Sequence, residues 1–202
     1  MELNIAAFVS SSASNGPGKR AVVWVQGCPF RCPGCFNPDF QPFDGGSPVS
    51  PGVLADRISV VDGIEGVTFS GGEPFCQAEG LAEAARRLKK QGLNVVTFTG
   101  LTYREIREKR RSSWNSLIRE TDLLIAGRYD RLLPARHPLL SSSNQDLVHI
   151  SPHMEGRIQE TGIEVEYIIG CSGEITVSGF PVQGSFRGRG GAGKKPCHIF
   201  HG

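Results

Sequence analysis

Short β-type apolar runs alternate with longer segments of helical periodicity between residues 21 and 126. The runs that predict strands are residues 21–25, 67–69, 94–99 and 122–126. Between the second and third of these, Leu81, Ala85 and Leu88 follow the i, i+4, i+7 spacing of an amphipathic helix. Strands that alternate with helices pair in parallel through right-handed crossovers. The sequence therefore predicts an α/β fold whose chemistry gathers at the carboxyl ends of parallel strands.

The ends of two helices are marked by capping residues. Ser50 followed by Pro51 is typical of a helix start. Thr102 and Glu105 have the spacing of a capping box, and we expect the helix that they open to run on through residues 107–111 to Leu117 and Ile118.

The two ends of the chain are less regular. Residues 3–9 predict an extra strand, joined to the strand at 21–25 through a turn at residues 15–18. Loop signals dominate residues 128–160, and the alternating segments 163–169 and 174–177 predict a small C-terminal β-hairpin. We expect one domain over residues 1–180 and a Gly/Arg/Lys-rich flexible tail over residues 181–202.

The composition excludes several classes of protein. A chain of 202 residues with 39% hydrophobic and 21% charged residues is long enough for one globular domain with a substantial core. It has no apolar stretch near the length of a membrane helix and no basic, signal-like start, so we expect a cytoplasmic protein without membrane partners. A net charge of +2 argues against nucleic acid as a partner. Six cysteines without an export signal argue against a disulfide scaffold.

Three of the cysteines form a tight group directly after the first parallel strand. Cys28, Cys32 and Cys35 have the spacing Cys-x3-Cys-x2-Cys. Thiolates suit iron–sulfur clusters and zinc, and three of them leave a four-iron cluster with one iron that has no protein ligand. Such an open position is typical of a catalytic metal site. Two alternatives remain open, a chance group of free thiols and a zinc site completed by His137, His149, His153 or Cys171.

A glycine-rich turn follows the second parallel strand. Gly71 and Gly72 allow a ligand to approach the backbone closely, and Glu73 can accept a charge-assisted hydrogen bond from an ammonium group. The turn precedes Pro74 and ends the strand that comes next along the chain after the cysteine loop. We therefore expect the cysteines and a pocket for an amino-acid-like ligand to share one edge of the sheet.

The cysteine loop and the Gly-Gly-Glu-Pro turn together resemble the radical S-adenosylmethionine superfamily. Within that superfamily, further segments resemble the activating proteins of anaerobic ribonucleotide reductase. These segments are residues 15–18, 26–29, 32–37, 99–103 and 142–145. The resemblance covers about residues 3–150 and implies an incomplete parallel (βα) barrel of the radical S-adenosylmethionine type.

The resemblance also implies cofactors, site residues and partners. Cys28, Cys32 and Cys35 would hold a [4Fe-4S] cluster, and S-adenosylmethionine would be the second cofactor. Residues expected near S-adenosylmethionine are Gly34, Cys35, Phe36, Asn37, Gly71, Gly72, Glu73 and Thr99. The implied reaction is reductive cleavage to a 5′-deoxyadenosyl radical, which would generate a glycyl radical on a large partner enzyme. The implied electron donor is a low-potential protein of the flavodoxin or ferredoxin type.

Two departures from the family pattern bear on these expectations. Ala126 stands where the family often has an acidic residue at the end of the fourth strand, which moves or removes a ribose contact, for which Asp130 is a nearby candidate. Residues 151–180 extend beyond the usual minimal activating protein. Two other functions therefore remain as alternatives: a radical S-adenosylmethionine enzyme with a small-molecule or peptide substrate, and a non-catalytic zinc or iron–sulfur electron-transfer module.

Overall fold

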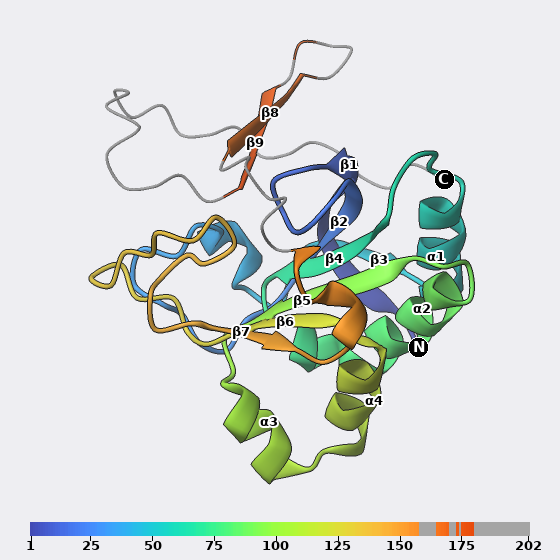
Figure 1. The fold of residues 1–202 in the computed structure, drawn as a ribbon. Helices are drawn as coiled ribbons and strands as arrows, with labels where there is room; N and C mark the ends of the chain where they lie inside the picture. Colours follow the sequence, from blue (N-terminus) through green and yellow to red (C-terminus); the bar gives the residue numbers. More distant parts are fainter. Residues whose placement is uncertain (158–164, 170–172, 174, 180–202) are drawn as a thin grey trace.

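A mixed seven-stranded sheet forms the centre of the molecule (Figure 1). The computed structural model describes residues 1–157, 165–169, 173 and 175–179. The strand order is β3-β1-β2-β4-β5-β6-β7. The strands are β1 (Leu3–Ser12), β2 (Arg20–Val25), β3 (Ser47–Val49), β4 (Gly66–Gly71), β5 (Asn94–Thr99), β6 (Leu123–Ala126) and β7 (Asp146–His149).

The four central strands, β2, β4, β5 and β6, pair in parallel, as the sequence predicts. Antiparallel strands extend this core on both sides: β1 and β3 beyond β2, and β7 beyond β6. The strand predicted at residues 3–9 is confirmed and pairs with β2 through the turn at residues 15–18. Strands β3 and β7 are not predicted from the sequence, because both are short. Strand β3 has one buried residue and β7 has none.

Helices cover one face of the sheet, with α2 packed between α1 and α4. The helices are α1 (Pro51–Ser59), α2 (Ala78–Lys89), α3 (Tyr103–Lys109) and α4 (Ser112–Glu120), with short 3-10 helices η1 (Pro38–Phe40), η2 (Pro74–Gln77) and η3 (Pro152–Met154). Alternate strand residues point to opposite faces, so Val95 belongs to the helix-covered core and Val96 to a smaller core on the other face. Leu139 and Met154, which lie outside the strands, pack in that smaller core.

The predicted caps are confirmed, but the helix expected through residues 107–111 is not continuous. The Ser50 side chain caps α1, and Thr102 and Glu105 form the capping box of α3. The helix is interrupted at Arg110, which adopts a left-handed conformation with φ 47°. The break lets α4 place Trp114 against the core, where its indole N–H donates to the Phe75 carbonyl at 3.0 Å.

The predicted C-terminal hairpin is present as β8 (Val165–Ile169) and β9 (Ile175–Gly179). It contacts the turn between β1 and β2, where the Asn15 side-chain amide donates to Ser178 Oγ at 2.6 Å. The tail predicted at residues 181–202 lies outside the described residues. None of the described helices combines the length and the apolar character needed to cross a membrane.

Candidate iron–sulfur and S-adenosylmethionine site

Hydrogen bonds close the cysteine loop on itself directly after β2. The Gly27 amide donates to the Phe40 carbonyl and the Cys28 amide to the Gln41 carbonyl, both at 2.8 Å. The side-chain amide of Gln26 donates to two further carbonyls of the returning segment, at 3.1 and 2.8 Å. The loop therefore returns to the end of β2, and its three cysteines lie within one short, closed segment.

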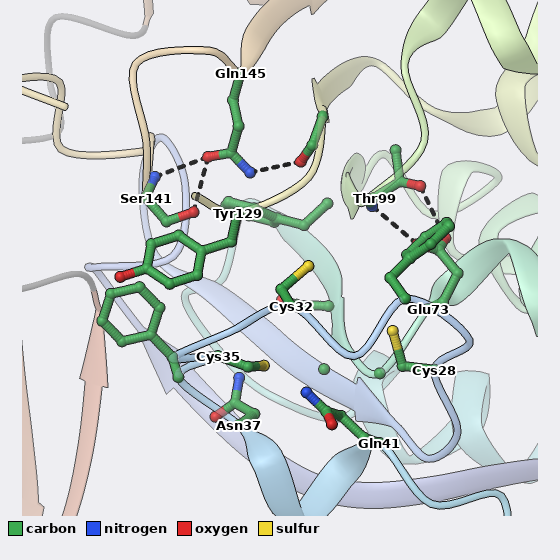
Figure 2. A pocket seen from close by; sticks show the side chains of 18 residues that line it. Cys28, Cys32, Cys35, Asn37, Gln41, Glu73, Thr99, Tyr129, Ser141 and Gln145 are labelled. Carbon is green, nitrogen blue, oxygen red and sulfur yellow. Dashed lines mark hydrogen bonds between the residues drawn. The ribbon is translucent and has the colours of Figure 1, made fainter. Parts of the chain in front are cut away.

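The three cysteine side chains line the same pocket, and their sulfurs surround a common space (Figure 2). All three are free thiols and half-buried. Burial raises the pKa of the Cys28 and Cys32 thiols, and hydrogen bonding to the Tyr129 backbone opposes this rise at Cys32. Binding of iron must therefore displace protons from these thiols.

The cysteine loop offers three free thiols to a metal group. Within the described part of the chain, no three His, Cys, Asp or Glu side chains are close enough to hold one metal ion. A cluster binds each thiolate at a different iron, so its ligands lie farther apart than those of one zinc ion. Neither His137 nor His149 lines the pocket, while Cys171 and the His153 side chain lie outside what is described. The described histidines proposed to complete a zinc site therefore lie outside the pocket.

The Gly-Gly-Glu-Pro turn packs directly against the cysteine loop. The Gly72 amide donates to the Val25 carbonyl at 2.7 Å and the Glu73 amide to the Gly27 carbonyl at 2.8 Å. A Cβ atom at Gly72 would lie 2.4 Å from the Gly27 oxygen, and one at Gly71, whose φ is +101°, would lie 2.6 Å from the Val25 nitrogen. Besides any ligand role, Gly71 therefore allows the end of β4 to approach β2, and Gly72 allows the turn to approach the cysteine loop.

Glu73 is buried at the base of the pocket and joins the ends of β4 and β5 (Figure 2). Its Oε1 accepts from the Phe75 amide at 2.9 Å and the Thr99 hydroxyl at 2.8 Å, and its Oε2 accepts from the Gly100 amide at 2.8 Å. Among the described residues Oε2 accepts this one hydrogen bond, and since a carboxylate oxygen can accept two, it can accept a second from a ligand. Burial raises the pKa of Glu73 to about 7.

The structure brings most of the other predicted residues to this pocket. Phe36, Asn37 and Thr99 line it together with Cys35, Gly71 and Gly72. Gly34 does not line it; this residue is exposed, and a Cβ there would lie 3.3 Å from the Arg131 side chain. The contacts of these residues with S-adenosylmethionine remain predictions.

Several pocket residues were not identified as site residues from the sequence. They are Gln41, Ser70, Phe98, Gly100, Gly127, Tyr129 and Ser141, whereas Gln145 lies in the segment 142–145 that resembles the family and Phe30 lies between the loop cysteines. Five of them lie at or just after the ends of β4, β5 and β6, so the rule that sites form at the carboxyl ends of parallel strands would have found them. Ala126 and Asp130 are absent from the lining, and the Asp130 carboxylate instead accepts from the Leu132 amide at 2.9 Å.

Gln145 fixes the wall of the pocket opposite the cysteine loop (Figure 2). Its Oε1 accepts from the Ser141 amide and hydroxyl at 2.9 and 2.8 Å, and its Nε2 donates to the Gly127 carbonyl at 2.8 Å. The same wall carries Tyr129, whose ring centroid lies 4.9 Å from that of Phe36. One side-chain amide thus holds the segment that follows β6 against the pocket.

Cys76 differs from the three loop cysteines. It is exposed and does not line the pocket. The beginning of a helix favours a thiolate, yet desolvation and the nearby Glu73 raise the pKa of Cys76 to about 11. Cys76 therefore offers a control for substitutions in the cysteine loop.

The chain resembles known activating enzymes over its sheet and pocket. It is 32% identical over 127 residues to the pyruvate formate-lyase-activating enzyme of Clostridium pasteurianum, covering 60% of this chain and 50% of that protein. It is 26% identical over 139 residues to the anaerobic ribonucleoside-triphosphate reductase-activating protein of Enterobacteria phage T4, covering 66% and 85%. The chain thus spans about half the length of the first relative and most of the second.

Two further comparisons extend this pattern. The pyruvate formate-lyase 1-activating enzyme of Escherichia coli K12 is 35% identical over 100 residues, covering 47% of this chain and 41% of that protein. The crystal structure of QueE from Escherichia coli matches 50% of this chain and 54% of its own with 20% identity and a TM-score of 0.43, a likeness too low to decide fold or function.

A family model described as a 4Fe-4S single cluster domain matches residues 14–148, which include all three loop cysteines, Glu73 and Gln145. The predicted cofactors, a [4Fe-4S] cluster and S-adenosylmethionine, agree with this match and with the activating enzymes among the relatives. The chain belongs to the 4Fe-4S single cluster domain family, and its recognition as a member of the radical S-adenosylmethionine superfamily is confirmed.

Proposed function

We propose that this protein cleaves S-adenosylmethionine reductively and uses the radical to generate a glycyl radical on a large partner enzyme such as anaerobic ribonucleotide reductase. One observation carries the proposal: three free thiols and the buried Glu73 carboxylate line one pocket at the ends of β2, β4 and β5. A cluster site and an acceptor for an amino-acid ligand thus lie in one pocket. The names of the relatives, which are activating enzymes of glycyl-radical-dependent reactions, support the choice of partner class.

Each pocket residue has a distinct role in this proposal. Cys28, Cys32 and Cys35 would hold the cluster, which when bound would supply the one electron needed to cleave a carbon–sulfur bond of S-adenosylmethionine to methionine and a 5′-deoxyadenosyl radical. The open acceptor position of Glu73 Oε2 orients the ammonium group of S-adenosylmethionine, a charge-assisted contact. Thr99 positions Glu73 through its hydrogen bond to Oε1.

The remaining predicted contacts complete the binding of S-adenosylmethionine. The backbone of Gly34, Cys35 and Phe36 lies near the adenine, and Asn37 supplies a polar contact. The backbone of Gly71 and Gly72 meets the methionine end. These assignments follow the superfamily pattern and are supported by the pocket lining for every residue except Gly34.

The shape of the sheet suits a large protein substrate. We propose that β2, β4, β5 and β6 form the parallel part of an incomplete barrel, which the partner enzyme closes when it presents its glycine. Free cysteines and an iron–sulfur site require a reducing compartment, so the cytoplasm is the proposed location. A low-potential flavodoxin or ferredoxin is the proposed electron donor.

The proposal is tested by comparing Cys28→Ala with Cys76→Ala after anaerobic reconstitution. With dithionite and S-adenosylmethionine, the wild-type protein and Cys76→Ala should release 5′-deoxyadenosine, because Cys76 lies outside the pocket. Cys28→Ala should reduce product formation by at least about 100-fold, because loss of one of three thiolates removes a cluster ligand. Product that survives in Cys28→Ala, or a wild-type protein that makes none, would refute the proposed chemistry.

The partner class needs a second measurement. When the activated protein is mixed with an anaerobic ribonucleotide reductase, electron paramagnetic resonance should detect a glycyl radical. S-adenosylmethionine cleavage without any glycyl radical would favour the alternative of a small-molecule or peptide substrate. A zinc or electron-transfer module would release no 5′-deoxyadenosine at all.

A further inference from the structure

Three exposed arginines surround the outer surface of the cysteine loop. Arg31 lies between the first two cysteines, and Arg128 and Arg131 follow β6 on the segment that packs against the loop. We call Arg31, Arg128 and Arg131 the arginine rim. Its members come from two loops that the sheet brings together.

The arginine rim is held by specific contacts with the loop. The Arg128 guanidinium carbon lies 4.7 Å from the centre of the Phe30 ring, and its Nη2 lies 3.9 Å from Glu105 Oε1. The Arg131 side chain lies beside Gly34, close enough that a Cβ at Gly34 would be 3.3 Å from Arg131 Cδ. Arg31 adopts a left-handed conformation with φ 49°. The Arg128 guanidinium is therefore held against the cysteine loop, and the Arg131 side chain lies beside that loop.

The arginine rim concentrates positive charge. Residues 29–36 and 128–131 contain three arginines and one acidic residue, Asp130, and with the Glu105 carboxylate beside Arg128 the local formal charge is +1. The apolar residues Pro29, Pro33 and Phe36 are exposed among the arginines. An apolar centre with a charged border is the usual anatomy of a protein–protein interface.

We propose that the arginine rim is the docking surface for an acidic protein that donates single electrons, an inference that rests on the proposed function. The rim lies over the loop that carries all three thiols, so a donor docked there approaches the cluster by a short path. Opposite charges steer such a partner and raise its association rate by about 10- to 1000-fold. In the step itself the donor loses one electron and the cluster gains one, and no bond or proton changes.

The test compares two reductants that differ in charge and size. The first is an acidic flavodoxin photoreduced to its hydroquinone, and the second is reduced methyl viologen, a small cation. In the double variant Arg31→Glu/Arg128→Glu, reduction by flavodoxin should slow about ten-fold or more, because the steering charge is reversed. Reduction by methyl viologen should not slow, because the cation gains from the new carboxylates.

A matched control reverses two charges far from the cysteine loop. Lys19 precedes β2 and Lys90 follows α2, so both lie toward the amino-terminal edge of the parallel strands, and both are exposed. Lys19→Glu/Lys90→Glu changes the net charge of the chain equally and should leave reduction by flavodoxin within about two-fold of wild type, since exposed charges beyond a Debye length of about 10 Å are largely screened.

Two further measurements do not require the double variant to carry a cluster. Oxidised flavodoxin should bind the cluster-free wild-type protein in a calorimetric titration, and the double variant should weaken this binding. In the wild-type holoprotein, added salt should slow reduction by flavodoxin but not by methyl viologen.

The outcomes separate this inference from the proposed function. Equal flavodoxin rates for wild type and the double variant, or rates independent of salt, would overturn the docking surface while leaving S-adenosylmethionine cleavage with dithionite intact. A double variant that is reduced normally by flavodoxin but no longer activates the glycyl-radical partner would also overturn it, because the rim would then bind that partner. A wild-type protein that neither reductant reduces would refute the cluster and, with it, both proposals.

Discussion

At the scale of the residue, Glu73 shows how one side chain serves both the fold and the site. Its carboxylate is 1% exposed and accepts three hydrogen bonds, two of them from residues at the end of β5. Burial disfavours the charged form, so these hydrogen bonds only partly offset the desolvation that raises its pKa to about 7. The same group that joins β4 and β5 thus presents an acceptor to the pocket.

The raised pKa of Glu73 predicts a pH-dependent stability. Its folded pKa of about 7 lies above the usual value of 4.5, so the folded state binds the proton more tightly. The stabilisation of the folded state by proton binding at Glu73 is complete below pH 4.5 and is lost as the pH rises to about 7. The free energy of unfolding should fall by about 3 kcal/mol over this range, at 1.36 kcal/mol per pKa unit.

Urea unfolding of the cluster-free protein between pH 4.5 and pH 8 checks this prediction. Glu73→Gln should remove most of the slope, because an amide does not titrate. Glu79→Gln, on the exposed first turn of α2, is the matched control and should retain it. A wild-type slope equal to that of Glu73→Gln would contradict the raised pKa.

At the scale of the element, the break between α3 and α4 has a local cost. Arg110 ends α3 in a left-handed conformation, which crowds the Cβ of any residue except glycine. The conformation persists because α4 buries Trp114, with Phe75 as its hydrogen-bond acceptor and ring neighbour. Tertiary packing of α4 therefore decides where α3 ends.

Glycine at this position should stabilise the protein. Arg110→Gly removes the Cβ crowding and should raise the free energy of unfolding by about 0.5–1 kcal/mol, after the entropy that glycine costs in the unfolded chain. Arg110→Ala keeps a Cβ and is the control, with no gain expected. Thermal unfolding of the two variants measures the difference, and equal melting temperatures would show that the break carries no strain.

At the scale of the whole molecule, Arg20 organises the edge of the sheet opposite the pocket. It is fully buried and donates to the carbonyls of Pro17 and Val67 and to Asn94 Oδ1. Burial lowers its pKa to about 9, so the guanidinium stays charged at neutral pH. These bonds tie the turn at residues 15–18 to β4 and β5, which fixes the register of the strands that carry the site.

Arg20→Lys should therefore destabilise the fold even though it preserves the charge. Lysine lacks the planar fork that reaches three acceptors, so buried acceptors lose partners at a cost of about 2–3 kcal/mol. Arg57→Lys, at a half-buried arginine that lies over the Phe8 ring, is the control and should change stability by less than about 1 kcal/mol. Urea unfolding gives both values, and an Arg20→Lys midpoint within error of wild type would show that the fork is not needed.

The Asn15-Gly16-Pro17-Gly18 segment belongs to this same edge and not to the pocket. A Cβ at Gly16 would lie 2.7 Å from Arg20 Nε, and the Asn15 carbonyl accepts from the Thr68 hydroxyl at 2.8 Å. This motif, which contributes to the family resemblance, therefore has an architectural role. Its distance from the cysteine loop along β2 separates it from the chemistry.

The sequence by itself determines the features that depend on neighbouring residues. The parallel strands, the caps at Ser50 and Thr102 and the C-terminal hairpin follow from periodicity and turn chemistry within a few residues. The convergence of the cysteine loop and the Gly-Gly-Glu-Pro turn also follows, because carboxyl ends of adjacent parallel strands share one edge.

The tertiary structure decides the features that join residues far apart. The bonds from Thr99 and Gly100 to Glu73 span 26 and 27 residues, and the bond from Arg20 to Asn94 spans 74. Gln145 reaches the pocket because β7, which it precedes, folds back beside β6. Such contacts depend on strand register and on how loops pack across the sheet, and no local pattern of residues encodes them.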